Sequence, residues 1–438
     1  VNIWRNIMRT IPSNINQNDI LLVESVNSVI SLHQLCIYAY IVCSAKNLTP
    51  IFLGDENNAI SLNKILPRYF EHFQVIEKPK LSFLKKSTLI LVALRIWAYQ
   101  LFRKKLILLK WEGLLIGDII YDQYLAMSRN GTVHYKDIYL AVIIFHVIVA
   151  VEKAKNSLNN IGPQALLLSH KTGLSSAPLA VASESNDVPI YSFGGGAYGT
   201  LMRSKRRKEY EYTPTSNELE SILEMPEDDF EIMFTKIKRD LFQGDFNADS
   251  KLAFANRLFT CRNEFSSTFN LDANKKNIFI MLHAFTDYPH SHFNGMLFLD
   301  YLDWFINTLE FISHDKSVNW IIKEHPSSAF YPVSDLNLQD LKLKYSSNNL
   351  VFMLNGVDFD SRSICNVGDV IVTCMGTAGF EFSALSGIPT ITAGDNPYAK
   401  CGFAVLPQTV SEYFNALSNI KNMNRLVGEE LKRAKATF

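Results

Sequence analysis

The sequence predicts an α/β protein built from two doubly wound domains that face each other across a cleft. Three observations predict this fold class. The length of 438 residues suits two or three domains. Short apolar runs alternate with helical stretches in both halves of the chain, which is typical of parallel sheets with crossover helices. This alternation breaks once, between residues 210 and 270.

The first half begins with the alternation of a strand, a helix and a second strand. The apolar runs 20–23 and 50–53 are predicted strands, and 31–46 between them is a predicted helix. The pattern then returns, with strands at 165–169 and 188–193 on either side of a helix at 175–185. These two groups predict one parallel sheet with crossover helices.

The second half repeats the pattern. Strands are predicted at 277–282, 318–323, 350–353, 370–373 and 390–392, with helices at 298–314 and 377–386. The region between the halves is basic at 203–208, then rich in acidic residues, and it reads as amphipathic helix. We therefore predict an N-terminal α/β domain (1–210), a helical connector (211–272) and a C-terminal α/β domain (273–438).

Composition excludes several classes of protein. The chain has 43 Lys and Arg against 43 Asp and Glu, so it lacks the basic excess of a general nucleic-acid binder. Its 29 Phe, 18 Tyr and 5 Trp exclude disorder as the dominant state. The 6 cysteines form no CxxC pair, which favours a reducing cytoplasm over a disulfide or zinc framework.

Two apolar segments resemble membrane spans. Residues 87–102 are interrupted by Arg95, and residues 139–151 number only 13. Neither reaches the roughly 20 apolar residues that a spanning helix needs. We predict buried core helices. The alternative, for residues 85–110, is a basic amphipathic face that rests on an anionic membrane, which is a peripheral contact with the inner face of the cytoplasmic membrane.

A predicted phosphate site follows the strand at 370–373. This strand ends at the small-residue turn Gly376-Thr377-Ala378, where a helix begins. Glycine lets a ligand approach the backbone closely, and the free N–H groups and dipole of a helix start favour a phosphate. Glu381, one turn into the helix, can accept hydrogen bonds from ribose hydroxyls. The alternative is a tight turn with a surface glutamate.

Two further strand ends carry polar residues. Lys323 and His325 alternate with Glu324 and can project to one side, where they would neutralise a leaving phosphate; Pro326 stiffens the turn. The alternative is a histidine satisfied by backbone. His283 and Asp287 follow the strand at 277–282 in a predicted ligand-facing loop. A metal is conceivable there, but no carboxylate or thiolate has ligand spacing, so we expect no metal and no cofactor.

The first half offers two candidates for catalysis. Asp118 stands in apolar surroundings and can act as general base on a sugar hydroxyl or as nucleophile, although such an aspartate more often caps a helix. His170 ends the strand at 165–169 and can contact an acceptor or hold the base.

Together these motifs resemble the capsule polysaccharide biosynthesis family of bacterial GT-B glycosyltransferases, which includes Kdo transferases. The resemblance is dense over 277–414 and thin before that. It rests on these motifs: His283-Ala284-Phe285-Thr286-Asp287-Tyr288-Pro289-His290, Asp300-Tyr301-x-x-Trp304, Lys323-Glu324-His325-Pro326, Gly376-Thr377-Ala378-Gly379-x-Glu381, Gly387-Ile388-Pro389, Pro397-Tyr398, Gly117-Asp118-x-x-Tyr121-Asp122 and Ser169-His170.

The resemblance implies two Rossmann-like domains of GT-B type. It implies that His325 and the Gly376-Thr377 turn contact the donor phosphate and that Glu381 contacts the ribose. The donor-binding set is then His283, Asp287, Lys323, His325, Pro326, Gly376, Thr377, Ala378 and Glu381. Similar elements occur in UDP-GlcNAc 2-epimerases and in polyol-phosphate polymerases of wall teichoic acid.

The expected function is therefore transfer of a sugar from a nucleotide-sugar donor to a growing capsular or lipopolysaccharide glycan. The expected donor is a CMP-activated acidic sugar such as Kdo, and the acceptor is an oligosaccharide or a lipid-linked glycan. Two alternatives stay open. One is a polyol-phosphate transferase of the CDP-glycerol type, and the other is a non-catalytic glycan-binding subunit of a capsule assembly complex.

Overall fold

The computed structural model describes residues 19–24, 26–55, 58–193, 201–208, 216–242, 253–254, 256–290 and 295–438. The chain divides into two compact units. The first comprises residues 1–124 and 134–211, and the second comprises residues 125–133 and 212–438. The helices of the predicted connector, 211–272, are grouped with the second unit.

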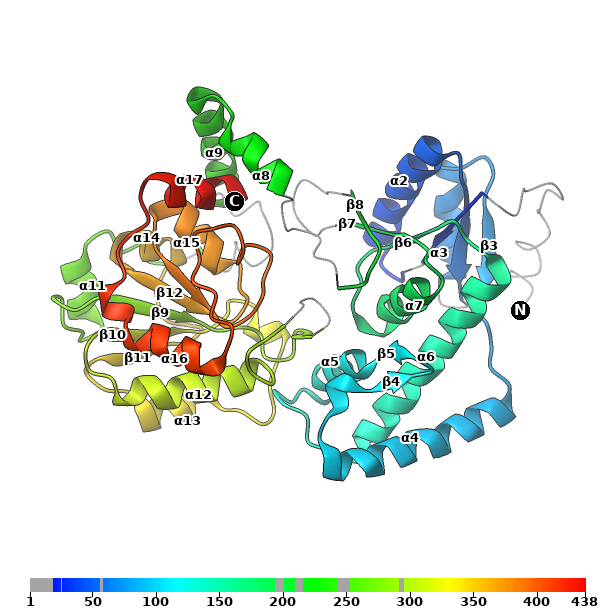
Figure 1. The fold of residues 1–438 in the computed structure, drawn as a ribbon, viewed down its shortest axis with the longest axis horizontal. Coiled ribbons are helices and arrows are strands. Elements are labelled where there is room, and N and C mark those ends of the chain that lie inside the picture. The colour runs from blue at the N-terminus through cyan, green and yellow to red at the C-terminus, as the bar shows by residue number, and fades with distance from the viewer. Residues whose placement is uncertain are drawn as a thin grey trace. The chain divides into compact units, whose positions relative to one another are not determined.

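A six-stranded sheet forms the centre of the first unit (Figure 1). Its strands, in spatial order, are β3 (Gln74–Glu77), β2 (Thr49–Gly54), β1 (Ile20–Val23), β6 (Ala165–Leu168), β7 (Ile190–Phe193) and β8 (Leu201–Ser204). All neighbours are parallel except β7 and β8. The strand order reverses between β1 and β6, so these two strands flank the switch point of the sheet.

Helices and one small hairpin complete this unit. The hairpin pairs β4 (Lys110–Trp111) with β5 (Leu114–Leu115). The helices are α2 (Val29–Lys46), α3 (Ala59–Ile65), α4 (Phe83–Arg103), α5 (Gly117–Ser128), α6 (Tyr139–Ile161) and α7 (Gly173–Ser185).

A five-stranded, fully parallel sheet forms the centre of the second unit. Its strands, in spatial order, are β11 (Leu350–Met353), β10 (Asn319–Lys323), β9 (Asn277–Met281), β12 (Val370–Thr373) and β13 (Thr390–Thr392). Its helices are α8 (Ser216–Leu223), α9 (Glu227–Phe242), α11 (Arg262–Thr268), α12 (Tyr301–His314), α13 (Leu338–Tyr345), α14 (Ile364–Val367), α15 (Ala378–Ser386), α16 (Val410–Ser418) and α17 (Gly428–Thr437).

This topology confirms the predicted fold class of two Rossmann-like α/β units. The central strands are buried on both faces, and each sheet is covered by apolar side chains of its helices, such as Trp304 of α12. Helix ends are defined locally. The Asp300 carboxylate accepts a hydrogen bond from the Asp303 N–H at the start of α12, and Gly387 ends α15 in the left-handed conformation.

The two segments that resembled membrane spans differ in their burial. The prediction of a core helix is confirmed for α6, which buries residues along most of its length. It is wrong for α4, which buries only Leu89, Ala93 and Gln100, because α4 packs on α6 through one face alone. Among the described helices, α2 alone is long and apolar enough to cross a membrane by length and composition, with 28% of that stretch buried. A core helix of a soluble protein passes the same test.

Candidate functional site

Three neighbouring strands of the second unit end at the same level. Lys323, the last residue of β10, pairs in register with Met281 of β9, and so does Thr373, the last residue of β12. Lys323 and Thr373 are thus two strand spacings apart, about 10 Å. The strand order reverses between β9 and β12, and ligands of open α/β sheets bind outside the carboxyl ends at such a switch point.

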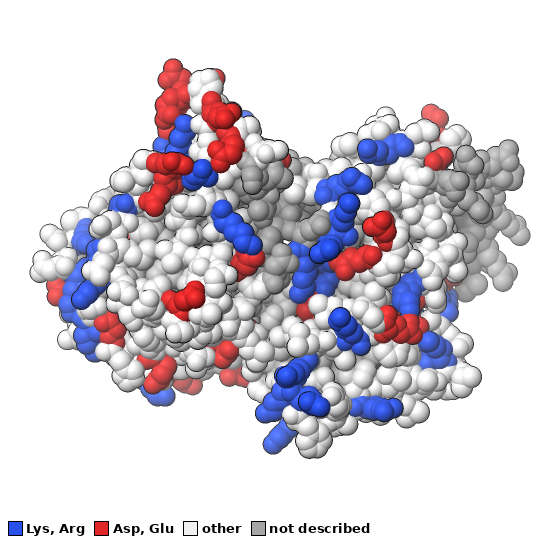
Figure 2. All heavy atoms as spheres, in the orientation of Figure 1, with Lys and Arg blue, Asp and Glu red and all other residues white. Residues whose placement is uncertain are grey.

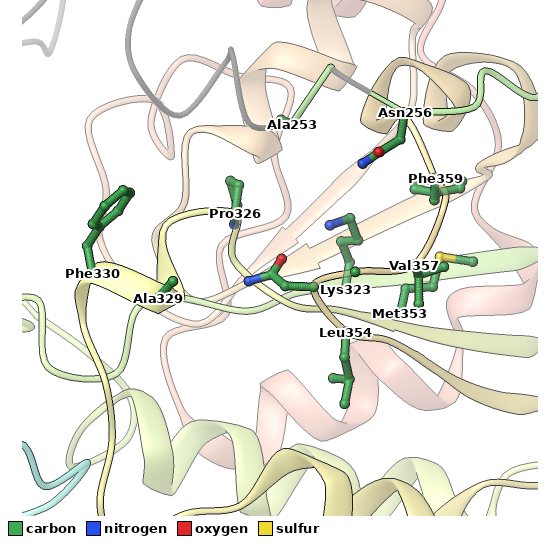
Figure 3. A pocket seen from close by; sticks show the side chains of 12 residues that line it. Ala253, Asn256, Lys323, Pro326, Ala329, Phe330, Met353, Leu354, Val357 and Phe359 are labelled. Carbon is green, nitrogen blue, oxygen red and sulfur yellow. The ribbon is translucent and has the colours of Figure 1, made fainter.

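Lys323 is a buried cation beside a cavity. Its side chain helps to line a cavity of about 240 Å³, together with Asn256, Pro326, Phe330 and Asn355. Figure 3 shows its amino group pointing into this cavity, toward the side on which Asn256 and Pro326 lie. Lys323 is 8% exposed, and its Nζ donates a hydrogen bond to the backbone carbonyl of Glu324 over 3.2 Å. Burial lowers the pKa of Lys323, and the nearby charge of Glu324 opposes this shift without cancelling it.

A polar network holds the loop that follows β10. The Glu324 carboxylate accepts from the Ser328 hydroxyl at 2.5 Å and from the Asn355 N–H at 2.7 Å. The Asn355 side chain donates to the His325 carbonyl at 3.1 Å. His325 Nδ1 accepts from the Ser327 N–H at 3.2 Å, so a neutral His325 ring carries its proton on Nε2. The loop is thereby fixed with His325 half-buried at its start.

His283 connects β9 to the turn after β12. Its Nε2 accepts a hydrogen bond from the Met375 N–H at 3.0 Å and lies 3.3 Å from the Thr373 hydroxyl. The ring stacks on Tyr301, with centroids 4.1 Å apart and planes 5° apart. Burial of the His283 ring, with a smaller contribution from the charge of His325, lowers the pKa of His283 to about 3. His283 is therefore a neutral acceptor that positions the turn.

Close packing explains the glycines at 376 and 379, on either side of Thr377 and Ala378. A Cβ at Gly376 would lie 2.8 Å from the Thr373 hydroxyl, and a Cβ at Gly379 would lie 2.1 Å from the Tyr398 hydroxyl. The Tyr398 hydroxyl in turn donates to the Gly376 carbonyl at 2.7 Å. At the start of α15, the N–H groups of Gly379 and Phe380 donate to the Gly376 and Thr377 carbonyls, so the dipole of the helix, more than unpaired N–H groups, favours an anion here.

The remaining donor-side residues lie at the margins of this arrangement. Glu381 is half-buried one turn into α15, and its charge contributes to the raised pKa of Tyr398, which is caused mainly by burial. Asp287 is half-buried in the turn after β9, where its N–H donates to the Ala284 carbonyl. Within the described ranges, no group of three or more His, Cys, Asp and Glu side chains is arranged to hold a metal ion.

The predicted donor residues thus fall into two adjacent groups. Lys323 and Pro326 line the cavity on the β10–β11 side. His283 and the turn at 376–378 form the second group at the ends of β9 and β12, outside the cavity lining. His325 connects the groups, since it follows Lys323 in the chain and its charge acts on His283. Asn355 was missed by the sequence prediction, although an Asn-Gly turn directly after an apolar strand is a detectable signal.

Asp118, in the first unit, is placed in a buried ion cluster. Its carboxylate is fully buried at the start of α5 and contacts Arg207 at 2.6 Å and Lys208 at 2.8 Å. Burial by itself raises the pKa of Asp118, but the two cations and their hydrogen bonds lower it overall. This environment favours a structural role that fixes residues 207 and 208 to α5. A catalytic role for Asp118 stays a prediction.

The switch point of the first sheet carries a carboxylate that the sequence prediction missed. Glu24 directly follows β1 and is buried. It accepts hydrogen bonds from the backbone and hydroxyl of Ser169, which follows β6, and from the Ser176 hydroxyl of α7 at 2.6 Å. His170, the next residue, is exposed, and its Nδ1 lies 3.5 Å from the Thr172 hydroxyl. Glu24 therefore holds the turn that presents His170.

Comparisons with known proteins give structural likenesses only. No protein-family model matches the chain, and no curated protein matches it. Three similar solved structures are described here with their TM-score, sequence identity, and coverage of this chain and of theirs. UDP-GlcNAc 2-epimerase from Neisseria meningitidis bound to UDP-GlcNAc has a TM-score of 0.28 at 10% identity, covering 95% and 97%. The Methanocaldococcus jannaschii UDP-GlcNAc 2-epimerase in complex with UDP-GlcNAc and UDP has a TM-score of 0.34 at 10% identity, and the match covers 95% of this chain and 96% of that one. Thermosulfurimonas dismutans KpsC, a beta Kdo 2,4 transferase, has a TM-score of 0.39 at 13% identity, and the match covers 63% of this chain and 79% of that one.

Proposed function

We propose that the chain is a glycosyltransferase whose nucleotide-sugar donor binds with its phosphate at the carboxyl ends of β9, β10 and β12. The observation that carries this proposal is Lys323. It is a buried cation at a cavity, and no carboxylate within the described ranges forms an ion pair with it. Burying an ammonium is costly, the charge of Glu324 offsets only part of that cost, and an anionic ligand would offset more of it.

The chemistry follows from where charge develops. When the bond between the sugar and the phosphate breaks, negative charge builds on the leaving nucleotide. Lys323 and the Nε2–H of His325 stabilise that charge, each charge-assisted hydrogen bond contributing about 1.5–3 kcal/mol. Such bonds accelerate transfer to the extent that they are stronger in the transition state than before it. His283 is neutral, so its role is to position the Met375 backbone and the start of α15.

The acceptor side is proposed to lie in the first unit. Of the two predicted residues, His170 is exposed at the end of β6, whereas Asp118 is buried and paired with two cations. We therefore assign acceptor contact to His170. The proposed donor is a CMP-activated acidic sugar of the Kdo type, and the proposed acceptor is a growing capsular or lipopolysaccharide glycan, both by resemblance of the sequence motifs.

Nucleotide binding followed by product analysis tests this function. Thermal unfolding is measured with CMP, CDP, UDP and GDP, and a stabilising nucleotide identifies the donor class. Mass spectrometry of an oligosaccharide acceptor then determines what is transferred. A mass increase of one sugar supports the proposal, whereas an added phosphodiester identifies a polyol-phosphate transferase. Absence of binding to all four nucleotides would leave a glycan-binding subunit as the better hypothesis.

A further inference from the structure

The outer face of α4 combines apolar and basic residues. Large apolar side chains face solvent along the whole helix, and Phe83, Leu84, Leu91 and Phe102 are 86%, 78%, 69% and 88% exposed. The buried residues, Leu89, Ala93 and Gln100, lie on the opposite side, against α6. At 100° per residue, positions 83, 84, 90, 91, 94, 98 and 102 fall on one continuous face.

The charge of this region is of one sign. Residues 78–111 contain nine Lys and Arg and no Asp or Glu, although the whole chain is neutral. Three of the nine pair with carboxylates outside the segment: Lys78 with Asp55 at 3.0 Å, Lys80 with Glu77 at 2.5 Å, and Lys85 with Glu152 of α6 at 3.1 Å. Within the part of the chain that the structure describes, no carboxylate forms an ion pair with Lys86, Arg95 or Lys105. Figure 2 shows Lys and Arg among uncharged residues along the edge of the first unit where Figure 1 places α4.

We propose that this face of α4 binds the surface of an anionic phospholipid bilayer, with the helix lying in the interface. An interfacial helix needs an apolar face to enter the acyl boundary and cations beside it to meet the headgroups, and α4 has both. Its 21 residues extend about 30 Å, so several headgroups lie within reach. A protein partner with an acidic rim is the competing occupant. The exposed cations beside the apolar row favour lipid, because anionic headgroups complement a charge of one sign while the acyl boundary takes up the apolar side chains.

This inference depends on the first unit alone and goes beyond the proposed nucleotide site. A chain that binds lipid but no nucleotide would contradict the proposed function and leave α4 as a membrane surface. A chain that binds nucleotide but no lipid would contradict the membrane proposal and leave the proposed function standing. The two proposals therefore fail separately.

Co-sedimentation of the full chain with vesicles tests the proposal. We expect binding to vesicles that contain phosphatidylglycerol, little binding to pure phosphatidylcholine, and loss of binding in high salt. The double variant Leu91→Gln/Leu94→Gln should weaken binding by about tenfold or more, and Arg95→Gln/Lys105→Gln should weaken it and reduce its salt dependence. The matched control is Leu343→Gln/Val427→Gln, which changes side chains that are 85% and 72% exposed in the second unit.

All three variants change exposed residues, so their thermal unfolding should match the unchanged chain. Wild-type binding from Leu91→Gln/Leu94→Gln, or equal loss from the control pair, would overturn the proposal. Sedimentation velocity without lipid provides a further criterion. If the unchanged chain is a dimer and the Leu91→Gln/Leu94→Gln variant is a monomer, the face binds a second copy of the chain, and the lipid assignment is overturned.

Discussion

Replacement of Lys323 by methionine should separate binding from folding. Methionine keeps the length and the apolar stem of the side chain but removes the charge. In the folded chain Lys323 is 8% exposed, and its ammonium group donates to one backbone carbonyl. The variant therefore tests whether the cation stabilises the fold or binds an anionic ligand.

The two effects of Lys323→Met have opposite signs. Burial lowers the pKa of Lys323, which means that the folded state disfavours the ammonium, so removing it should leave the free energy of unfolding unchanged or raise it. Loss of one charge-assisted hydrogen bond to phosphate costs about 1.5–3 kcal/mol, which corresponds to roughly 10- to 150-fold in Kd. We expect a chain that is at least as stable and binds nucleotide much more weakly.

Titration calorimetry and urea unfolding measure the two quantities. The control is Lys421→Met, which removes an exposed lysine of the same unit and should leave Kd unchanged. The pH dependence is a second criterion. Because the folded-state pKa of Lys323 lies below its ordinary 10.5, nucleotide affinity should fall as the pH rises through that lower value. Wild-type affinity in Lys323→Met, or a loss of stability that accounts for the weaker binding, would refute the reasoning.

Three further variants test positioning residues. His283→Phe leaves the Met375 N–H without its acceptor and should lower the free energy of unfolding in urea by about 1–3 kcal/mol. Since the pKa of His283 falls from 6.5 to about 3 on folding, this variant should also lose less stability than the wild type as the pH falls across that range. Asp118→Ala leaves Arg207 buried without a counter-charge and should cost about 3–5 kcal/mol. The folded-state pKa of Asp118 is lowered, so the stability that it contributes is present above pH 3.8 and disappears as the pH falls through the folded-state pKa. Normal stability with abolished turnover would instead make Asp118 catalytic. Glu24→Gln should reduce turnover without changing nucleotide Kd, and an altered Kd would contradict its placement on the acceptor side.

The strands were predictable because a buried parallel strand is a continuous apolar run. The predicted bounds 350–353, 370–373 and 390–392 agree with β11, β12 and β13. The edge strands β3 and β8 were missed, since the exposed side of an edge strand admits residues such as Gln74 and Arg203 that break the apolar pattern. Local composition therefore reveals the centre of each sheet better than its borders.

The candidate site was predictable where its residues follow strands and unpredictable where contacts are distant in sequence. Lys323 ends β10 and His283 follows the neighbouring strand β9, so the alternation of strands and helices was sufficient to bring them to one edge. The partner of Asp118 is Arg207, 89 positions away, and no local pattern around Asp118 indicates it. The same holds for Glu24, whose hydrogen bonds to Ser169 and Ser176 join segments about 150 residues apart.

The chain is neutral overall, yet its cations occupy three different environments. Arg207 is buried and neutralised by Asp118. The cations of α4 are exposed, so water and salt screen them whether or not a partner is present. Lys323 is buried, no described carboxylate forms an ion pair with it, and the nearby charge of Glu324 offsets its burial only in part. An anionic ligand would supply the rest of the opposite charge, and the cavity beside Lys323 leaves room for such a ligand.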